Sequence, residues 1–291
     1  MSTDPASFIA EHDGVRLAGE ESGERLTDRR SAGEGPPIVL LHGLTATRRY
    51  VVMGSRSLER SGHQVIAYDA RGHGQSAPAR DPAAYTYELL ADDLEAVLDA
   101  TGVQRAVLAG ASMGAHTAVR FALRHPERVA ALALITPAFD PSQPSDPAEL
   151  SRWDALAEGL RTGGVEGFVT AYDLGAVGDR WRETTAKVLR QRLSAHEHPE
   201  AVADALQAVP RSRSFESLDE LAVIEAPVIV VASRDEADPG HPLAVAERYA
   251  QAIAAARLIV EDPGPPVRSP IAWQGGALSQ LLAELAASAR T

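Results

Sequence analysis

The feature that most constrains the fold is a series of short, wholly apolar runs that recur along the chain with helical patterns between them. The runs are Ile38–Leu41, Val65–Tyr68, Ala106–Ala109, Ala131–Ile135, Val228–Val231 and Leu258–Val260. Each has the length of a strand and lacks polar alternation, which is typical of a strand buried on both faces. Strands that alternate with helices predict an α/β fold, in which a mostly parallel sheet is covered by helices on both faces.

The N-terminal segment differs from these runs because it favours an antiparallel hairpin. Within Phe8–Gly23, two short apolar stretches flank Asp13-Gly14. The dipeptide Asp-Gly is a strong signal for a two-residue hairpin turn. We therefore expect two antiparallel strands at one edge of the sheet, which brings the total to about eight strands.

The alternation of strands and helices stops between Asp140 and Leu221. Helical patterns such as Ala148–Leu160 and Thr184–Leu193 dominate this stretch, and no buried-strand run interrupts them. The strand pattern then resumes and needs the first half of the chain for pairing. We therefore expect one core formed by residues 1–140 and 217–291, with residues 141–216 inserted as a helical cap.

The strongest chemical motif is Gly110–Gly114, which reads G-A-S-M-G with Ser112 at its centre. It directly follows a predicted strand and opens a predicted helix, which is the context in which G-x-S-x-G forms a nucleophile elbow. Small flanking residues let the backbone turn sharply enough to hold a serine in a strained conformation. The motif therefore predicts an exposed serine hydroxyl at the carboxyl edge of the sheet, near a helix N-terminus.

Two further segments complete a resemblance to the α/β-hydrolase fold family, which covers nearly the whole chain. His42-Gly43-Leu44 looks like the oxyanion loop of that family, and Asp69–Ser76 looks like its D-x-R-G-x-G-x-S turn. The resemblance implies an oxyanion hole formed by the backbone amides of Leu44 and Met113. It also implies that His42 braces the loop and does not act as the base.

The resemblance places the catalytic acid after the strand that follows the insertion. Three carboxylates lie there, at Asp235, Glu236 and Asp238. Asp238-Pro239 best matches the D-P-x-x-P turn of the family, which favours Asp238 as the acid and leaves Asp235 as the alternative.

The catalytic histidine of the family is absent from its expected place. The turn after the last predicted strand, Glu261–Pro270, has prolines at positions 265 and 266, and no histidine occurs after His241. A serine without a proton acceptor attacks slowly, so weak ester hydrolysis is expected if no other base serves. His241, three residues from Asp238, is the candidate base. His196 or His198 could instead reach the serine from the insertion, and His241 could be structural.

Composition excludes several other kinds of chemistry and partner. The chain has no cysteine, so it has neither a thiol nucleophile nor a disulfide. A net charge of -12 with a single lysine disfavours nucleic-acid binding. The N-terminus lacks the pattern of a signal peptide, and no apolar stretch approaches a membrane span, which predicts a cytoplasmic protein without a membrane partner. No metal site or cofactor motif is predicted, and a homodimer is left open.

These features predict a serine hydrolase, similar to a carboxylesterase, that acts on a small apolar ester, lactone or other acyl compound through an acyl-enzyme at Ser112. The predicted catalytic set is Ser112, Asp238 and His241. Because the terminal histidine is missing, two alternatives remain: a lyase or cyclase on the same fold, and a ligand-binding protein that has lost turnover. Fold alone does not choose among these functions.

Overall fold

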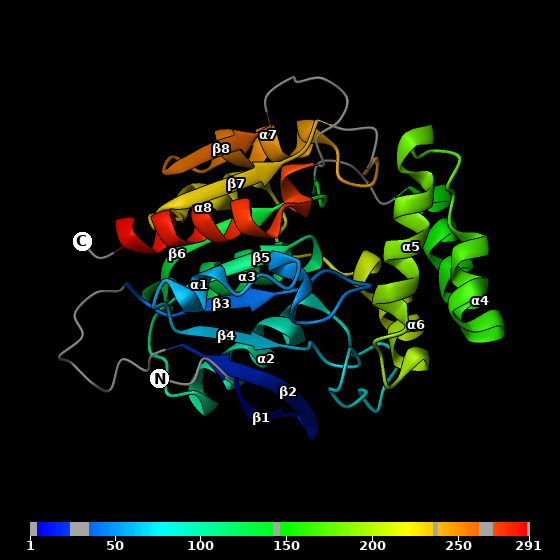
Figure 1. Cartoon of the computed structure of the whole chain (residues 1–291), viewed down its shortest axis with the longest axis horizontal. Coiled ribbons are helices and arrows are strands. Elements are labelled where there is room, and N and C mark those ends of the chain that lie inside the picture. Colours follow the sequence, from blue (N-terminus) through cyan, green and yellow to red (C-terminus); the bar gives the residue numbers. More distant parts are fainter. Residues whose placement is uncertain (1–4, 24–34, 142–145, 235–237, 262–269, 290–291) are drawn as a thin grey trace.

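The computed structural model describes residues 5–23, 35–141, 146–234, 238–261 and 270–289. Its centre is one eight-stranded sheet in the order β1-β2-β4-β3-β5-β6-β7-β8 (Figure 1). The strands are β1 (Ala6–His12), β2 (Val15–Ser22), β3 (Ile38–Leu41), β4 (Val65–Tyr68), β5 (Ala106–Ala111), β6 (Val129–Ile135), β7 (Val228–Ala232) and β8 (Ala256–Val260). Strands β3 to β8 pair in parallel, as the apolar runs predict.

The predicted N-terminal hairpin is present at the edge of this sheet. β1 pairs antiparallel with β2 as far as His12 and Val15, and β2 pairs antiparallel with β4. Asp13 and Gly14 join the strands with φ values of 49° and 70°. Two successive positive φ angles are what a type I′ turn requires, and Asp-Gly supplies them at low cost.

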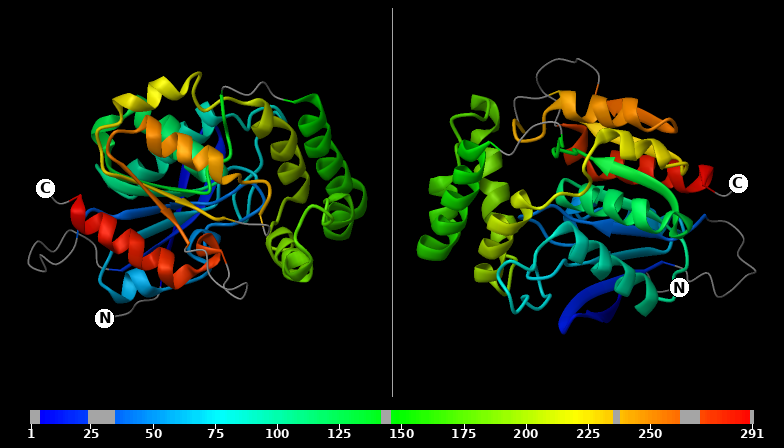
Figure 2. Two further views of the ribbon diagram at one scale, coloured as in Figure 1. Left: turned by 90° about the horizontal axis from the view of Figure 1, so that it is seen from above. Right: turned by 180° about the vertical axis from the view of Figure 1, so that it is seen from behind.

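Helices cover both faces of the sheet, which explains why its central strands, β3 to β7, are apolar (Figure 2). Along β5, Val107 and Leu108 contribute to different hydrophobic clusters, one on each side. One side is covered by α2 (Tyr87–Ala100), α3 (Met113–Arg124) and α7 (Leu243–Ala252). The other side is covered by α1 (Ser57–Arg60) and α8 (Gly275–Ser288).

Between β6 and β7 the chain forms a third helical layer beside the sheet, made of α4 (Pro147–Ala171), α5 (Arg182–Leu193) and α6 (Pro199–Ala208) (Figure 1). The helix α4 bends at Gly164, where φ is 59°. Gly159 and Gly167 then approach so closely that a Cβ on Gly159 would lie 2.6 Å from the Gly167 carbonyl oxygen. Among the described helices, none is long and apolar enough to cross a membrane.

This helical layer shares a hydrophobic cluster with the core. The cluster contains Leu44 and Met113 from the core and Leu156, Leu160 and Phe168 from α4. All five side chains are buried. The helices therefore pack against the same residues that the sequence assigns to the oxyanion hole.

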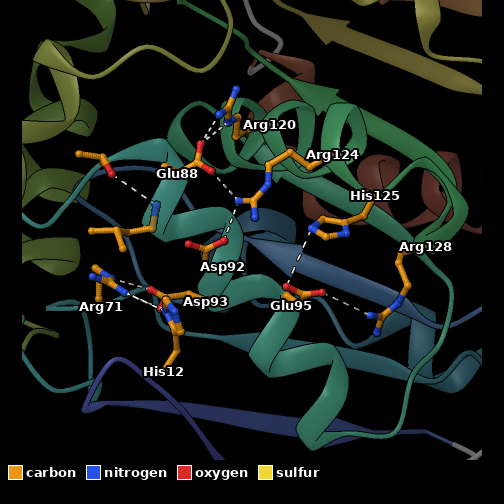
Figure 3. Close-up of polar contacts among 12 residues, drawn as sticks. His12, Arg71, Glu88, Asp92, Asp93, Glu95, Arg120, Arg124, His125 and Arg128 are labelled. Carbon is orange, nitrogen blue, oxygen red and sulfur yellow. Dashed lines mark hydrogen bonds and ion pairs between the residues drawn. The ribbon is translucent and has the colours of Figure 1, made fainter.

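A buried ion pair holds the turn after β4 against α2 (Figure 3). Arg71 is wholly buried, and its Nε and Nη2 donate to the two carboxylate oxygens of Asp93 at 2.7 Å each. His12 Nδ1 lies 2.9 Å from the same carboxylate and links the hairpin to it. By contrast, Glu88 pairs with Arg120 and Arg124 at the exposed surface of α2 and α3.

We predict that Asp93→Asn lowers the free energy of unfolding by about 3 to 5 kcal/mol, because the variant leaves the Arg71 cation buried without a counter-charge. Glu88→Gln is the matched control, since it breaks an exposed ion pair and should cost less than about 1 kcal/mol. Urea unfolding of both variants measures the difference. Equal losses in the two variants would contradict the assignment of the buried pair.

Candidate active site

Ser112 occupies a sharp turn between β5 and α3. The strand ends at Ala111, the helix begins at Met113, and Ser112 has φ 50° and ψ -113°. A non-glycine residue with positive φ is strained and needs support from its surroundings. The Ser112 amide donates to the carbonyl of Ile135 at 2.9 Å and ties the turn to β6.

Two glycines permit this turn because the backbones on either side of it almost touch. A Cβ at Gly110 would lie 2.2 Å from the Gly114 carbonyl oxygen. A Cβ at Gly114 would lie 2.1 Å from the carbonyl oxygen of Leu41 on β3. Any side chain at either position would push α3 away from the sheet. The glycines of the G-x-S-x-G motif are therefore required by packing.

His241 contacts the hydroxyl of Ser112. Its Nε2 lies 2.8 Å from Ser112 Oγ, and its Nδ1 lies 2.7 Å from Asp238 Oδ1. The amide of His241 also donates to the Asp238 carbonyl at 3.1 Å, so the imidazole and the carboxylate belong to one tight turn before α7. An ionised Asp238 accepts a hydrogen bond from Nδ1–H, which leaves Nε2 with a lone pair that faces the serine hydroxyl.

Asp238 remains ionised although it is largely enclosed. Burial alone would raise the pKa of its carboxyl group. The charge and the hydrogen bond of His241, together with the charge of Arg192, outweigh burial and lower the pKa below its usual value. The alternative acid, Asp235, lies outside the described residues, as does the proline-containing turn 262–269.

The two histidines of the helical layer do not contact Ser112 in the described part of the chain. His196 Nδ1 accepts a hydrogen bond from the Gly74 amide at 2.9 Å, and its Nε2 faces the Thr45 carbonyl at 3.3 Å. Both of its nitrogens are therefore used to join the helical layer to the turn after β4 and to the loop after β3. His198 lies at the N-terminus of α6.

The loop after β3 runs beside Ser112 and is held by buried histidines. A Cβ on Gly43 would lie 3.6 Å from the Cβ of Ser112. His42 Nε2 accepts from the Ala70 amide at 2.9 Å, and His73 Nε2 faces the Leu44 carbonyl at 2.8 Å. The ring of His73 packs 5.1 Å from His42, measured between centroids. These contacts fix the position of the loop that carries Leu44.

His116, one turn into α3, is a structural neighbour of the site. Its Nε2 accepts from the amides of Ala138 and Phe139 at 3.1 Å each, and its Nδ1 bonds the hydroxyl of Tyr87 at 3.0 Å. Burial, with a smaller effect from the charge of His241, lowers the pKa of His116 to about 3. The neutral ring anchors the segment that follows β6.

No group of three or more potential metal ligands lies together within the described ranges. The chemistry that the visible side chains support is proton transfer between a hydroxyl, an imidazole and a carboxylate.

The buried histidines predict a loss of stability in mild acid. Because the pKa of folded His116 is about 3 and that of an unfolded histidine is about 6.5, its contribution is complete above the unfolded value and is lost as the pH falls. At pH 5 the loss from this residue is about 2 kcal/mol. Urea unfolding should give the wild type a lower free energy of unfolding at pH 5.0 than at pH 7.5. In His116→Gln, whose amide oxygen can still accept a hydrogen bond, the decrease between the two pH values should be smaller by about this amount. An unchanged difference would contradict the neutral, buried state of His116.

Sheet order, elbow and side-chain contacts together define an α/β protein with a serine–histidine–aspartate chain at the carboxyl edge of a parallel sheet. Residues 36–266 match the family model described as the alpha/beta hydrolase fold. The chain belongs to this family, as the three sequence motifs imply.

Several proteins with similar sequences or structures are hydrolases by name. The chain is 30% identical over 205 residues to a putative carbamate hydrolase, RutD, of Variovorax paradoxus, covering 70% of this chain and 75% of the relative. It is 32% identical to a 2-hydroxy-6-oxononadienedioate/2-hydroxy-6-oxononatrienedioate hydrolase of Pseudomonas putida, covering 70% and 73%. A thermophilic esterase from Thermogutta terrifontis has a similar structure, with a TM-score of 0.76, 25% identity and coverage of 99% and 100%.

Proposed function

We propose that this protein is a serine hydrolase that cleaves small carboxylic esters or lactones, with Ser112 as nucleophile, His241 as base and Asp238 as acid. The observation that carries the proposal is the pair of contacts from His241, 2.8 Å to Ser112 Oγ and 2.7 Å to Asp238 Oδ1. Both distances lie within the range for proton transfer from a nucleophile to its base and for orientation of that base by a third group.

In the proposed reaction, Ser112 Oγ attacks the ester carbonyl carbon while its proton passes to His241 Nε2. The amides of Leu44 and Met113 stabilise the oxyanion of the tetrahedral intermediate. His241 then gives the proton to the leaving alcohol oxygen as the carbon–oxygen bond breaks, which leaves an acyl-enzyme. A water molecule loses a proton to His241 and attacks the acyl carbon, and the carboxylic acid leaves as Ser112 regains its proton.

The state of Asp238 supports this division of roles. Its lowered pKa keeps the carboxylate ionised at neutral pH. An ionised partner holds His241 in the tautomer with a free Nε2 lone pair and stabilises the imidazolium that forms during attack. The expectation of weak hydrolysis depended on the absence of a base, and the proposal replaces it with hydrolysis that depends on His241.

The relatives favour hydrolysis over the alternatives. Three relatives are named a putative carbamate hydrolase, a 2-hydroxy-6-oxononadienedioate/2-hydroxy-6-oxononatrienedioate hydrolase, and an esterase. A histidine poised against the serine also argues against a ligand-binding protein without turnover, because such a protein has no need of an oriented base. No specific observation favours a lyase or cyclase.

Residues 141–216 are proposed to serve as a cap over the pocket. The shared cluster of Leu44 and Met113 with α4 supports this role, since the side chains of the two residues assigned to the oxyanion hole pack in one cluster with the helical layer. An inserted cap supplies pocket walls and excludes water from the acyl-enzyme.

We predict that Ser112→Ala and His241→Ala each lower kcat for 4-nitrophenyl esters by at least about 10³-fold, because residues of a catalytic triad act as a unit. Both variants should also lose labelling by a fluorophosphonate probe, and mass spectrometry of the wild type should locate the label on Ser112. His198→Ala is the control and should keep its activity within about twofold. Full labelling of His241→Ala would show that another group activates the serine.

Asp238→Asn keeps His241 but removes the carboxylate that orients it, so the variant tests the orientation of the base apart from its presence. An amide favours the wrong tautomer of His241, so kcat should fall by roughly 10³- to 10⁴-fold while KM changes little. The exposed Asp179 provides a control, since Asp179→Asn should leave kcat unaltered. If Asp238→Asn kept wild-type kcat, the acid would have to be sought at another position.

A further inference from the structure

Arg192 on α5 is a half-buried cation that has no counter-ion among the described residues. Its guanidinium lies over the ring of Tyr50, 5.1 Å from the ring centroid. The Nε atom is closed to solvent and has no hydrogen-bond partner. Among the described residues, none accepts a hydrogen bond from this guanidinium or lies within ion-pair distance of it. Burial lowers the pKa of Arg192, an effect that the negative charge of Asp238 partly offsets.

Other enclosed arginines of this protein are paired. Arg71 binds Asp93 through two hydrogen bonds of 2.7 Å. Arg48 Nη1 lies 2.6 Å from Asp69 Oδ2, and Arg161 Nη2 lies 2.7 Å from Asp204 Oδ1. An enclosed cation without a partner is costly, and folded proteins normally pair such groups. Arg192 lacks such a partner among the described residues, so it can bind an anion that is not part of the described chain.

The position of Arg192 connects it with the proposed active site. Its charge is one of the influences that lower the pKa of Asp238, so the two groups lie within electrostatic range. Asp238 does not neutralise it, because the carboxylate is engaged by His241. Tyr50, under the guanidinium, begins the short helix η1 (Tyr50–Val52) that follows the loop of Leu44. Arg192 thus contacts, from the helical layer, the core segment that follows this loop.

We propose that Arg192 binds a carboxylate group of the substrate, so that the enzyme selects esters or lactones that carry a second, negatively charged end. This inference rests on the proposed hydrolase function and names its substrate class. The planar guanidinium can donate two parallel hydrogen bonds to the two oxygens of a carboxylate. A carboxylate carries one negative charge, which one guanidinium neutralises, whereas a phosphate carries close to two and would leave an unneutralised negative charge near the ionised Asp238. The chemistry therefore favours a carboxylate.

The test compares two esters that differ only at the far end of the acyl chain. 4-Nitrophenyl hydrogen glutarate ends in a carboxylate, and 4-nitrophenyl pentanoate ends in a methyl group. Arg192→Gln should lower kcat/KM for the glutarate ester by about 10- to 100-fold more than for the pentanoate ester, since it removes a charged hydrogen bond made to one substrate only. Arg192→Lys should restore part of the preference, because it keeps the charge without the fork.

Arg190→Gln is the matched control, because Arg190 lies two residues away on the same helix and pairs with Glu166 at the surface. It should leave the ratio of the two kcat/KM values unchanged. An equal loss for both esters in Arg192→Gln would overturn the proposal and leave Arg192 as a support for Asp238 alone.

Binding measured without turnover separates this inference from the proposed reaction. Calorimetric titration with glutarate should detect binding to the wild type and to Ser112→Ala, and a loss of at least about tenfold in affinity in Arg192→Gln. If neither ester were hydrolysed but glutarate bound in this pattern, the hydrolase proposal would fail and the carboxylate site would stand. Equal glutarate affinity in the wild type and Arg192→Gln, or tighter binding of inorganic phosphate than of glutarate, would overturn the carboxylate site.

Discussion

The close approach of three backbones around Ser112 is the constraint on which the rest of the site depends. Gly110 and Gly114 let β3, β5 and the start of α3 meet with no side chain between them. That contact stabilises the positive φ of Ser112, whose hydroxyl lies 2.8 Å from His241 Nε2. The loop of Leu44 and the turn of His241 follow the carboxyl ends of other strands in the same parallel sheet. Chain segments far apart in the sequence therefore converge on one hydroxyl.

Buried polar groups form the second level of organisation. Neutral imidazoles join the loop after β3, the turn after β4 and the helical layer through backbone hydrogen bonds, as His42 and His196 do. Arg71 joins the same turn to α2 through a fully paired charge. Each of these groups has its hydrogen bonds satisfied inside the protein, which makes the framework rigid around the reactive residues. Arg48, Arg71 and Arg161 have such partners, whereas Arg192 has none among the described residues.

The sequence predicted the fold better than the arrangement of the site. Short, β-branched apolar runs such as Val228–Val231 favour buried strands, and the Asp-Gly pair favours its turn from local sequence alone, so the predicted strand and the predicted hairpin were both correct. His241 and Ser112 are separated by 129 positions in the chain, and no local sequence pattern predicts a contact between residues so far apart. Reasoning from the usual chain position of a base made this histidine one of several candidates. Arg192 carried no signal at all, because an arginine on an amphipathic helix normally faces solvent.

When an imidazole and its carboxylate partner lie on one turn, the fold has fewer separate chain segments to align. In the proposed triad, Asp238 and His241 are separated by two residues and share a backbone hydrogen bond, so any displacement of the turn moves them together. Their mutual geometry is thus insensitive to shifts that would disrupt a pair drawn from two loops. The segment after β8 holds no histidine, so in the proposed reaction it does not supply the base. The proposal therefore allows natural variation in the length or composition of this segment without an effect on proton transfer.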